Sequence, residues 1–411
     1  MEIRPILSAL LRSKTGPILV AIQVAISLAI LANTLHIVQL RQAVSHRPSG
    51  VANEGDVFAV DIRHLKTPPH EESLAMQKAE TATMRAVPGV MSVAQTSQLP
   101  LSRSGNYTGM AISRGQQKTN AVASTYYGPD SLVKTFGLQL VEGRDFAPGE
   151  APEVDTNTSK EFPKVVIISR ALAQKLWPTA SSYVGKPMFF GTSDDDSEVR
   201  IIGVVERLQT PGAEVTDRGE QTVLVPMRAT GDPGYTYAVR AEPGQLDRVM
   251  RDVEVSLRNA TPEPIVIRTQ AISKMRDDRY RADRALAWML VTVSVLLLLV
   301  TASGIVGMAS LWVTQRRKQI GVRRALGARR LDILRYFITE NVMITSSGVV
   351  AGLMLALALN QLLVSQLEME RLPAAYLIAG ALVFWGLGII AVYGPAWRAA
   401  SISPATATRS I

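Results

Sequence analysis

Apolar residues gather in four long runs that contain no charged side chain. The runs cover Thr15–Leu40, Ala285–Gln315, Asn341–Leu367 and Leu372–Trp397. A helix of about 20 apolar residues crosses the hydrocarbon core of a bilayer, and backbone groups inside lipid must pair within their own segment. We therefore expect four transmembrane α-helices.

The first run is the least apolar of the four, because Gln23, Asn33 and His36 interrupt it. These side chains are costly in lipid, so we expect them to face protein. A cleaved signal peptide is the alternative, but its apolar part spans only about 7–15 residues and ends at a small-residue site. The longer run, with no such site after it, favours a membrane helix.

The segment between the first and second runs alternates strand-like and helix-like patterns. Short stretches rich in β-branched residues predict strands, at 57–62, 165–169, 199–205 and 222–226. Apolar residues at helical spacing predict helices, over 71–87, 169–177 and 245–260. We expect a large α+β domain, with a porter-like part and a second subdomain, inserted between the first and second spans.

Helical patterns continue from this domain into the flanking runs. Residues 36–46 extend the first run outward, and residues 271–288 lead into the second run with alternating charges typical of a solvated stalk. Since a continuous helix is stiff, we expect movement at one end of each stalk to reach the other end.

Composition agrees with a membrane protein, since only 19% of the residues are charged and 47% are hydrophobic. The net charge of +9 would suit a nucleic-acid partner if it covered a soluble face. Between Arg41 and Asp283, however, 29 Lys/Arg stand against 30 Asp/Glu. The excess lies beside the apolar runs, so no nucleic-acid partner is expected. The absence of cysteine excludes disulfides and thiolate metal sites.

The short flanks of the runs predict the orientation. The segment between the second and third runs carries eight Lys/Arg against Asp332 and Glu340, whereas the charged residues of the next connection are Glu368, Glu370 and Arg371. Cytoplasmic loops carry the Lys/Arg excess. We expect both termini and the basic loop in the cytoplasm and the large domain on the other side. Residues 1–14 have helical apolar spacing that predicts a short helix on the cytoplasmic membrane surface.

These patterns divide the chain into eight parts. In order they are a surface helix (1–14), the first span with its stalk (15–46), the exported domain (47–270, with its second subdomain at about 130–228), a stalk and second span (271–315), a cytoplasmic loop or helix (316–335), the third and fourth spans (336–367 and 372–397) and a tail (398–411).

The basic segment 315–341 is the most informative cytoplasmic piece. It is short and basic, with apolar residues at intervals and glycines at Gly321 and Gly327 that permit turns or close backbone approach. Its arginines offer fork-shaped donors to carboxylates. One interpretation is a positive-inside loop with an interfacial helix. The other is a short helix that docks into a cytoplasmic partner.

This segment resembles the coupling loop of MacB/FtsX-like ABC permeases, which reads E-I-G-I-x-[RK]-A-[LIV]-G-A with a later Glu opening the next span. The resemblance extends in order over nearly the whole chain, through stretches such as 87–101, 126–146 and 165–188 and the tail from Pro395. The matching loop residues are Ile320, Gly321, Val322, Arg324, Ala325, Leu326, Gly327, Ala328 and Glu340.

The resemblance implies a dimer of four-helix permeases in a bacterial inner membrane, each contacting a separate ABC ATPase through Ile320, Gly321, Arg324, Ala325, Leu326, Gly327 and Glu340. For Glu340, a bridge to the loop arginines is the alternative to contact with the ATPase. It implies mechanotransmission, in which ATP and Mg²⁺ act on the partner and this chain holds no cofactor. A periplasmic adaptor and an outer-membrane duct would complete an efflux complex. Lipoprotein release or control of cell-wall hydrolases are alternatives on the same fold.

The sequence departs from the family pattern at several charged positions. Gln319 replaces the usual Glu, and Trp397, Ser401, Ser403 and Thr408 replace common tail residues. Two interpretations stay open. The chain pairs with a different permease that keeps fuller ATPase contacts, or the changes are neutral and it pairs with itself.

Chemistry within the chain is sparse. No G-x-x-x-x-G-K-[ST] phosphate-binding loop occurs, and no nucleophile motif is present, so we expect no enzyme activity in this chain. His64 and His70 lie near acidic residues, but their spacing matches no metal site, and a solvated loop is preferred. A membrane-anchored sensor without a transport role remains an alternative from another class.

Two small-residue pairs in the spans permit close helix approach. Gly348 and Gly352 form one pair, and Ser303 and Gly307 form the other. Packing within the chain and a dimer seam are equally compatible with this spacing.

Overall fold

The computed structural model describes residues 15–193, 197–261, 263–367 and 371–401. The expected surface helix at 1–14 and the tail from 402, with Ser403 and Thr408, lie outside the described residues. The chain forms two compact units. One comprises residues 1–43 and 283–411, and the other comprises Val44–Ala282.

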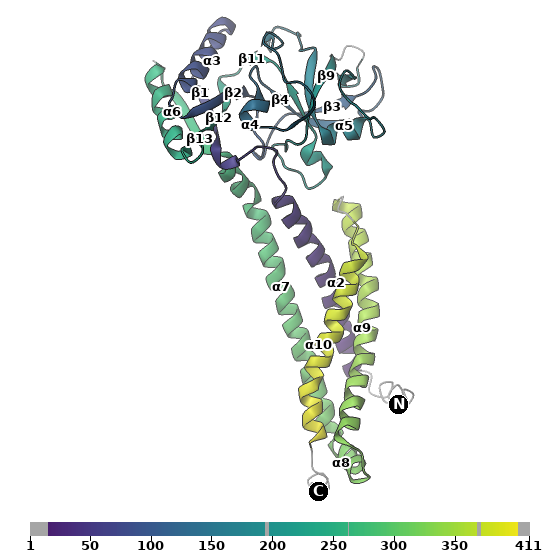
Figure 1. Cartoon of the computed structure of the whole chain (residues 1–411). Helices are drawn as coiled ribbons and strands as arrows, with labels where there is room; N and C mark the ends of the chain where they lie inside the picture. Colours follow the sequence, from purple (N-terminus) through teal and green to yellow (C-terminus); the bar gives the residue numbers. More distant parts are fainter. Residues whose placement is uncertain (1–14, 194–196, 262, 368–370, 402–411) are drawn as a thin grey trace. The chain divides into compact units, whose positions relative to one another are not determined.

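The described part of the first unit is helical, and four of its helices are long and apolar enough to cross a membrane. The third of these begins at Arg330, earlier than the expected residue 336, because the same helix continues through the end of the basic segment. The helices of this unit are α2 (Thr15–Ser45), α7 (Ile272–Gln315), α8 (Arg317–Ala325), α9 (Arg330–Leu367) and α10 (Ala374–Ala400) (Figure 1).

The second unit contains a four-stranded antiparallel sheet in the order β13-β1-β12-β2. Two helices cover one face of this sheet (Figure 1), through a core that includes Phe58, Val60 and Val253. The chain order is β-α-β followed, after an insertion, by β-α-β, which is the split form of a ferredoxin-like motif. Its elements are β1 (Val57–His64), α3 (His70–Arg85), β2 (Val90–Thr96), β12 (Gly234–Ala241), α6 (Leu246–Ala260) and β13 (Ile265–Ala271).

The insertion forms a seven-stranded mixed sheet in the order β5-β9-β7-β10-β4-β3-β8. Because β8 also pairs with β9, the sheet curls back on itself. It starts at Tyr107, well before residue 130, where the sequence pattern placed the second subdomain. The strands are β3 (Tyr107–Ala111), β4 (Ala121–Tyr127), β5 (Leu140–Gly143), β7 (Val165–Ser169), β8 (Pro187–Phe190), β9 (Glu198–Val205) and β10 (Thr222–Val225).

Smaller elements complete the insertion. They are α4 (Leu132–Phe136), α5 (Arg170–Leu176) and the parallel pair β6 (Glu153–Asp155) and β11 (Arg228–Thr230). All four predicted strands and all three predicted helices of this unit are present. The remaining strands escaped prediction because they are short or carry polar residues on one face.

A buried polar cluster lies between α3 and the four-stranded sheet. Glu80 accepts hydrogen bonds from the Tyr237 hydroxyl at 2.6 Å and pairs with His64 Nε2 at 2.9 Å. His64 is only 5% exposed, so the expected solvated loop is wrong at this position. Burial raises the pKa of Glu80, and its bonds to Tyr237 and His64 oppose that rise.

We predict that Tyr237→Phe lowers the free energy of unfolding by about 1–3 kcal/mol at neutral pH, because a buried carboxylate loses a donor. A group whose folded-state pKa is raised loses stability as pH rises through that pKa. The loss should therefore shrink once Glu80 is protonated in acid. Urea titration of the full chain in nanodiscs at pH 7 and pH 4 measures both values, and equal losses would contradict the assignment.

Candidate functional site

The basic segment forms a compact tip between α7 and α9. We call the first, helical unit, which contains this tip, the membrane unit. Helix α8 ends where Gly327 adopts a left-handed φ of 98°, a typical helix C-terminal conformation. The Ala328 amide then donates to Arg323 O at 3.1 Å. The backbone amide of Arg329 donates to Asp332 Oδ2 at 3.0 Å as α9 begins. A sharp turn therefore joins two helices at the tip.

One side of α8 is anchored in the membrane unit. Ile320 and Gly321 are buried, and Ile320 packs in the core that includes Ile333 and Phe337. Arg324 Nη1 donates to the Ala400 carbonyl at 2.6 Å, which ties α8 to the end of α10. These contacts hold α8 in a fixed orientation.

Glu340 stabilises the tip through its contacts with Arg316. It is 1% exposed, and both its carboxylate oxygens accept from Arg316 Nη1, at 3.0 and 2.9 Å. Arg316 also donates to the Tyr336 hydroxyl at 3.3 Å, and the Arg323 guanidinium lies 5.2 Å from the Tyr336 ring centroid. Glu340 thus bridges to a loop arginine, and its side chain is covered.

The opposite side of α8 and the following turn are open. Leu326 is 83% exposed, and Val322 and Leu331 are more than half exposed. Such large apolar side chains at a free tip are surrounded by exposed arginines. We call this set the tip surface, and it consists of Val322, Arg323, Ala325, Leu326, Gly327, Arg329, Arg330 and Leu331.

The predicted loop residues therefore separate into two groups. Ala325, Leu326 and Gly327 belong to the tip surface, whereas Ile320, Gly321 and Glu340 lie inside and set its shape. The supporting pair of Arg316 with Tyr336 was not singled out from the sequence. The bridge from Glu340 to a loop arginine is one of the two roles that the sequence left open for this residue.

The two small-residue pairs also differ. A Cβ on Gly348 would lie 2.7 Å from Ala21 O, and one on Gly352 would lie 3.0 Å from Ala25 O. This pair lies where α9 meets α2 within one chain. Ser303 and Gly307 on α7 are exposed, and a Cβ on Gly307 meets nothing within 4 Å.

The polar residues of the first span face protein. Asn33 is buried and donates to Ala29 O at 2.9 Å and Ala356 O at 3.2 Å. His36 is buried, with its ring centroid 5.3 Å from that of Tyr376. The expectation from lipid cost is confirmed at these two positions.

In the second unit, Arg276 joins the first turns of α7 to the residues that follow α2. Its guanidinium donates to both carboxylate oxygens of Glu54, at 2.7 and 2.6 Å, and to the carbonyls of Ser45 and Arg47. Both charged side chains are about four-fifths buried. No local pattern predicts this pair, because its members lie 222 positions apart in the chain.

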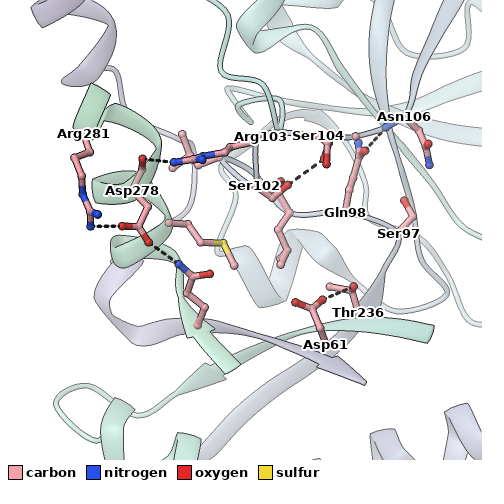
Figure 2. A pocket seen from close by; sticks show the side chains of 15 residues that line it. Asp61, Ser97, Gln98, Ser102, Arg103, Ser104, Asn106, Thr236, Asp278 and Arg281 are labelled. Atoms are coloured by element: carbon pink, nitrogen blue, oxygen red, sulfur yellow. Dashed lines mark hydrogen bonds and ion pairs between the residues drawn. The ribbon is translucent and has the colours of Figure 1, made fainter. Parts of the chain in front are cut away.

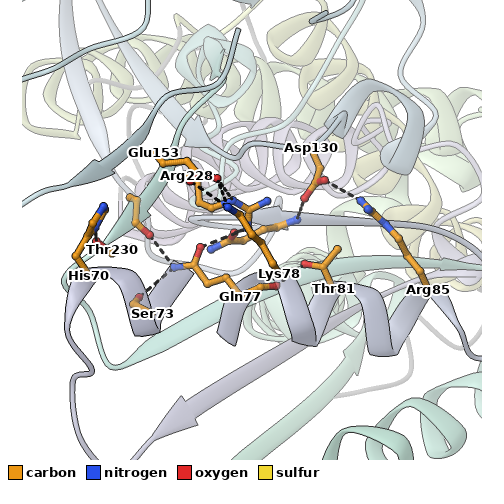
Figure 3. Close-up of polar contacts among 12 residues, drawn as sticks. His70, Ser73, Gln77, Lys78, Thr81, Arg85, Asp130, Glu153, Arg228 and Thr230 are labelled. Carbon is orange, nitrogen blue, oxygen red and sulfur yellow. Dashed lines mark hydrogen bonds and ion pairs between the residues drawn. The ribbon is translucent and has the colours of Figure 1, made fainter. Parts of the chain in front are cut away.

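A polar seam links α3 to the insertion (Figure 3). Gln77 donates to Ala229 O at 2.9 Å, and Lys78 pairs with Glu153 at 2.8 Å. His70 Nδ1 lies 2.8 Å from the Thr230 hydroxyl. His70 and His64 therefore take part in separate contacts rather than in one site.

Comparison with known proteins identifies two family matches. Residues 20–255 match the MacB-like periplasmic core domain, and residues 291–404 match the FtsX-like permease C-terminal family. The first match alone covers more than half of the chain.

Two named relatives are exporters. The macrolide export ATP-binding/permease protein MacB of Agrobacterium fabrum is 29% identical over 72% of this chain and 44% of its own length. The pyoverdine export ATP-binding/permease protein PvdT of Pseudomonas syringae is 30% identical over the same shares. A solved heavy metal efflux pump is 12% identical, covering 85% of this chain and 34% of its own, with a TM-score of 0.18 that supports no conclusion on fold.

The chain spans less than half the length of these curated relatives. The matched regions cover most of the α+β unit and the later helices, and four helices among the described residues are long and apolar enough to span a membrane. This chain is therefore a multi-pass membrane protein that belongs to the family with a MacB-like periplasmic core domain, and its later helices match the FtsX-like permease C-terminal model.

Proposed function

We propose that this chain is the permease subunit of an ABC-type efflux complex that works by mechanotransmission. A separate ATPase, which holds ATP and Mg²⁺, docks on the tip surface at the cytoplasmic side of a bacterial inner membrane. Both termini lie on that side, and the α+β unit works in the periplasm. The excess of Lys/Arg around α8 supports this orientation.

The tip surface is the observation that carries the proposal. Exposed Leu326 and its apolar neighbours have no covering partner within the described chain, while the opposite side of α8 is anchored by Ile320 and Arg324. A rigid apolar surface surrounded by arginines is complementary to an apolar groove whose edges carry acidic side chains. Buried anchors of this kind dominate the binding energy of interfaces.

The continuity of α7 supports the relay of motion. This helix runs from Ile272 to Gln315, 44 residues, and ends beside α8 in sequence. Arg276, near its start, is held by Glu54 in an ion pair whose two side chains are about four-fifths buried. Displacement of the tip would therefore act on a stiff rod whose far end is fixed to the α+β unit.

The remaining partners follow from the same proposal. A second permease, either a second copy or a paralogue, completes the membrane part. A periplasmic adaptor and an outer-membrane duct provide the exit route. No cofactor is assigned to this chain.

We expect Leu326→Asp to reduce permease-dependent stimulation of the partner ATPase at least fivefold, because a charge replaces the apolar anchor at the docking surface. The assay measures ATP hydrolysis by the co-purified ATPase with the permease in nanodiscs. The side chain is 83% exposed, so insertion and thermal stability should stay unchanged.

Leu65→Asp is the matched control, since Leu65 is 73% exposed but lies in the α+β unit. It should leave stimulation unchanged. Full stimulation by Leu326→Asp, or an equal loss from both variants, would refute docking on the tip surface.

A further inference from the structure

The α+β unit contains a polar cavity of about 860 Å³ that the proposed coupling does not use. Three structures line it: the sheet face opposite α3 and α6, the loop between β2 and β3, and the first turns of α7 (Figure 2). This volume is typical of pockets that hold drug-sized ligands.

The loop wall of the cavity is held in an unusual conformation. Leu101 and Arg103 have positive φ values of 67° and 80°, which cost energy for residues other than glycine. The amide of Leu101 donates to Thr210 O at 3.3 Å, and that of Arg103 donates to Pro211 O at 2.8 Å. Such strain persists only where neighbours hold it, so this wall is preformed.

A side-chain amide braces the same loop. Gln98 Oε1 accepts from the Asn106 backbone amide at 2.6 Å, while its Nε2 donates to Ser124 Oγ at 2.7 Å. Gln98 is 5% exposed. The backbone of the loop therefore closes around a fixed amide.

Of the charged side chains that line the cavity, some form ion pairs and others do not. Asp278 is satisfied, because Arg281 lies 2.6 Å and the Gln270 amide 3.0 Å from its carboxylate. Arg103 donates to the backbone oxygen of Asp278 at 2.7 Å, and it makes no ion pair with any described residue. One guanidinium therefore remains without a carboxylate.

Asp61 is a carboxylate of the same cavity that likewise has no ion-pair partner in the part of the chain that the structure describes. Its Oδ1 accepts from the Thr236 hydroxyl at 2.6 Å, and over the described parts of the chain it has no cationic partner within ion-pair distance. Figure 2 shows Asp61 on the sheet side and Arg103 on the loop side of the cavity. Hydroxyl and amide groups also line the cavity, including those of Ser97, Ser102 and Asn106.

We propose that this cavity binds a short, hydrophilic, zwitterionic peptide, with its carboxylate at Arg103 and its ammonium at Asp61. Guanidinium suits a carboxylate, since charge-assisted hydrogen bonds are the strong ones. The serine hydroxyls and the amides match peptide groups, and only Leu99, Leu101 and Met275 offer apolar surface. A largely apolar ligand would leave Arg103 and Asp61 without an ionic partner.

The cavity wall formed by α7 gives this ligand a place in the proposed mechanism. Met275, Asp278 and Arg281 belong to the helix that we propose as the moving rod. The further step, that this peptide is the molecule that the complex exports, rests on the proposed function. Binding itself does not, because it is measured on this chain alone.

The test uses the full chain in nanodiscs and an equimolar pool of tetrapeptides made of Gly, Ser and Asn, with retention measured by native mass spectrometry. Wild type should retain the free peptides about tenfold better than the same pool N-acetylated or C-amidated, since each capping removes one charged contact. Arg103→Gln should lose the sensitivity to amidation, and Asp61→Asn should lose the sensitivity to acetylation.

Arg251→Gln, an exposed change on α6, is the control and should behave as wild type. Melting temperatures establish that the variants are folded. No retention by wild type, or equal retention of free and capped peptides, would overturn the proposal. A pool that is both N-acetylated and C-amidated is measured as well. Retention of only this doubly capped pool would also overturn the proposal, since that result indicates a segment of a longer partner chain.

Discussion

Gly348→Leu is expected to break the packing of α9 on α2 and to lower the stability of the membrane unit by about 3 kcal/mol or more. A Cβ at this position would lie 2.7 Å from the backbone oxygen of Ala21 and 2.9 Å from the Cβ of Val24. Backbone atoms cannot move aside as a flexible side chain does, so the helices must separate. Thermal unfolding of the full chain in nanodiscs measures the effect.

Gly307→Leu is the matched control, because a Cβ there meets nothing within 4 Å. It should leave the unfolding midpoint unchanged. If Gly307 lies in a seam with a second permease, the variant changes the dimer fraction instead, which crosslinking detects. An equal drop in the midpoint of both variants would show that Gly348 is not a close-contact position.

Arg276→Met is expected to destabilise the α+β unit by about 2–3 kcal/mol, because it leaves Glu54 four-fifths buried without its cation. The methionine keeps the apolar stem of the side chain, so most of the loss reflects the missing charge and hydrogen bonds. Urea unfolding of the full chain, followed by protection of the α+β unit from protease, gives the magnitude. Arg251→Met on the exposed face of α6 should cost little.

The same ion pair predicts a pH dependence. Burial by itself raises the pKa of Glu54, but hydrogen bonds from Arg276 and Ser49 outweigh burial and hold that pKa below its usual 4.5. A group with a lowered folded-state pKa stabilises the fold above its unfolded pKa and loses this contribution as pH falls through the folded value. The difference in stability between wild type and Glu54→Gln should therefore be full above about pH 5 and shrink in acid. A difference that stays constant to pH 2 would contradict the assignment.

The periodic and uncharged segments were predictable from sequence because their structure depends on local requirements. A run such as Leu372–Trp397 has to be helical if it lies in lipid, and it falls almost entirely within α10. The strand at 165–169 is rich in β-branched residues and has the predicted bounds. Short strands such as β6 and β11, three residues each, exist only because each pairs with the other.

The tip surface was partly predictable. The basic, glycine-containing pattern indicated a short helix that could dock, yet the sequence does not say which side of α8 is free. Packing decides this, because Ile320 fills the core with Ile333 and Phe337 while Leu326 is left outside. For Glu340 the sequence left open a bridge to a loop arginine or a contact with a partner, and the structure shows an ion pair with Arg316.

By itself, the sequence determined the four apolar helices, the basic segment and an α+β unit between the first two helices, because hydrophobicity and charge act locally along the chain. Only the tertiary structure decided which glycines touch backbone, that Glu54 meets Arg276, and that Asp61 and Arg103 face one cavity. These relations join residues that lie tens to hundreds of positions apart, and no local pattern encodes a contact that arises only when sheets and helices pack.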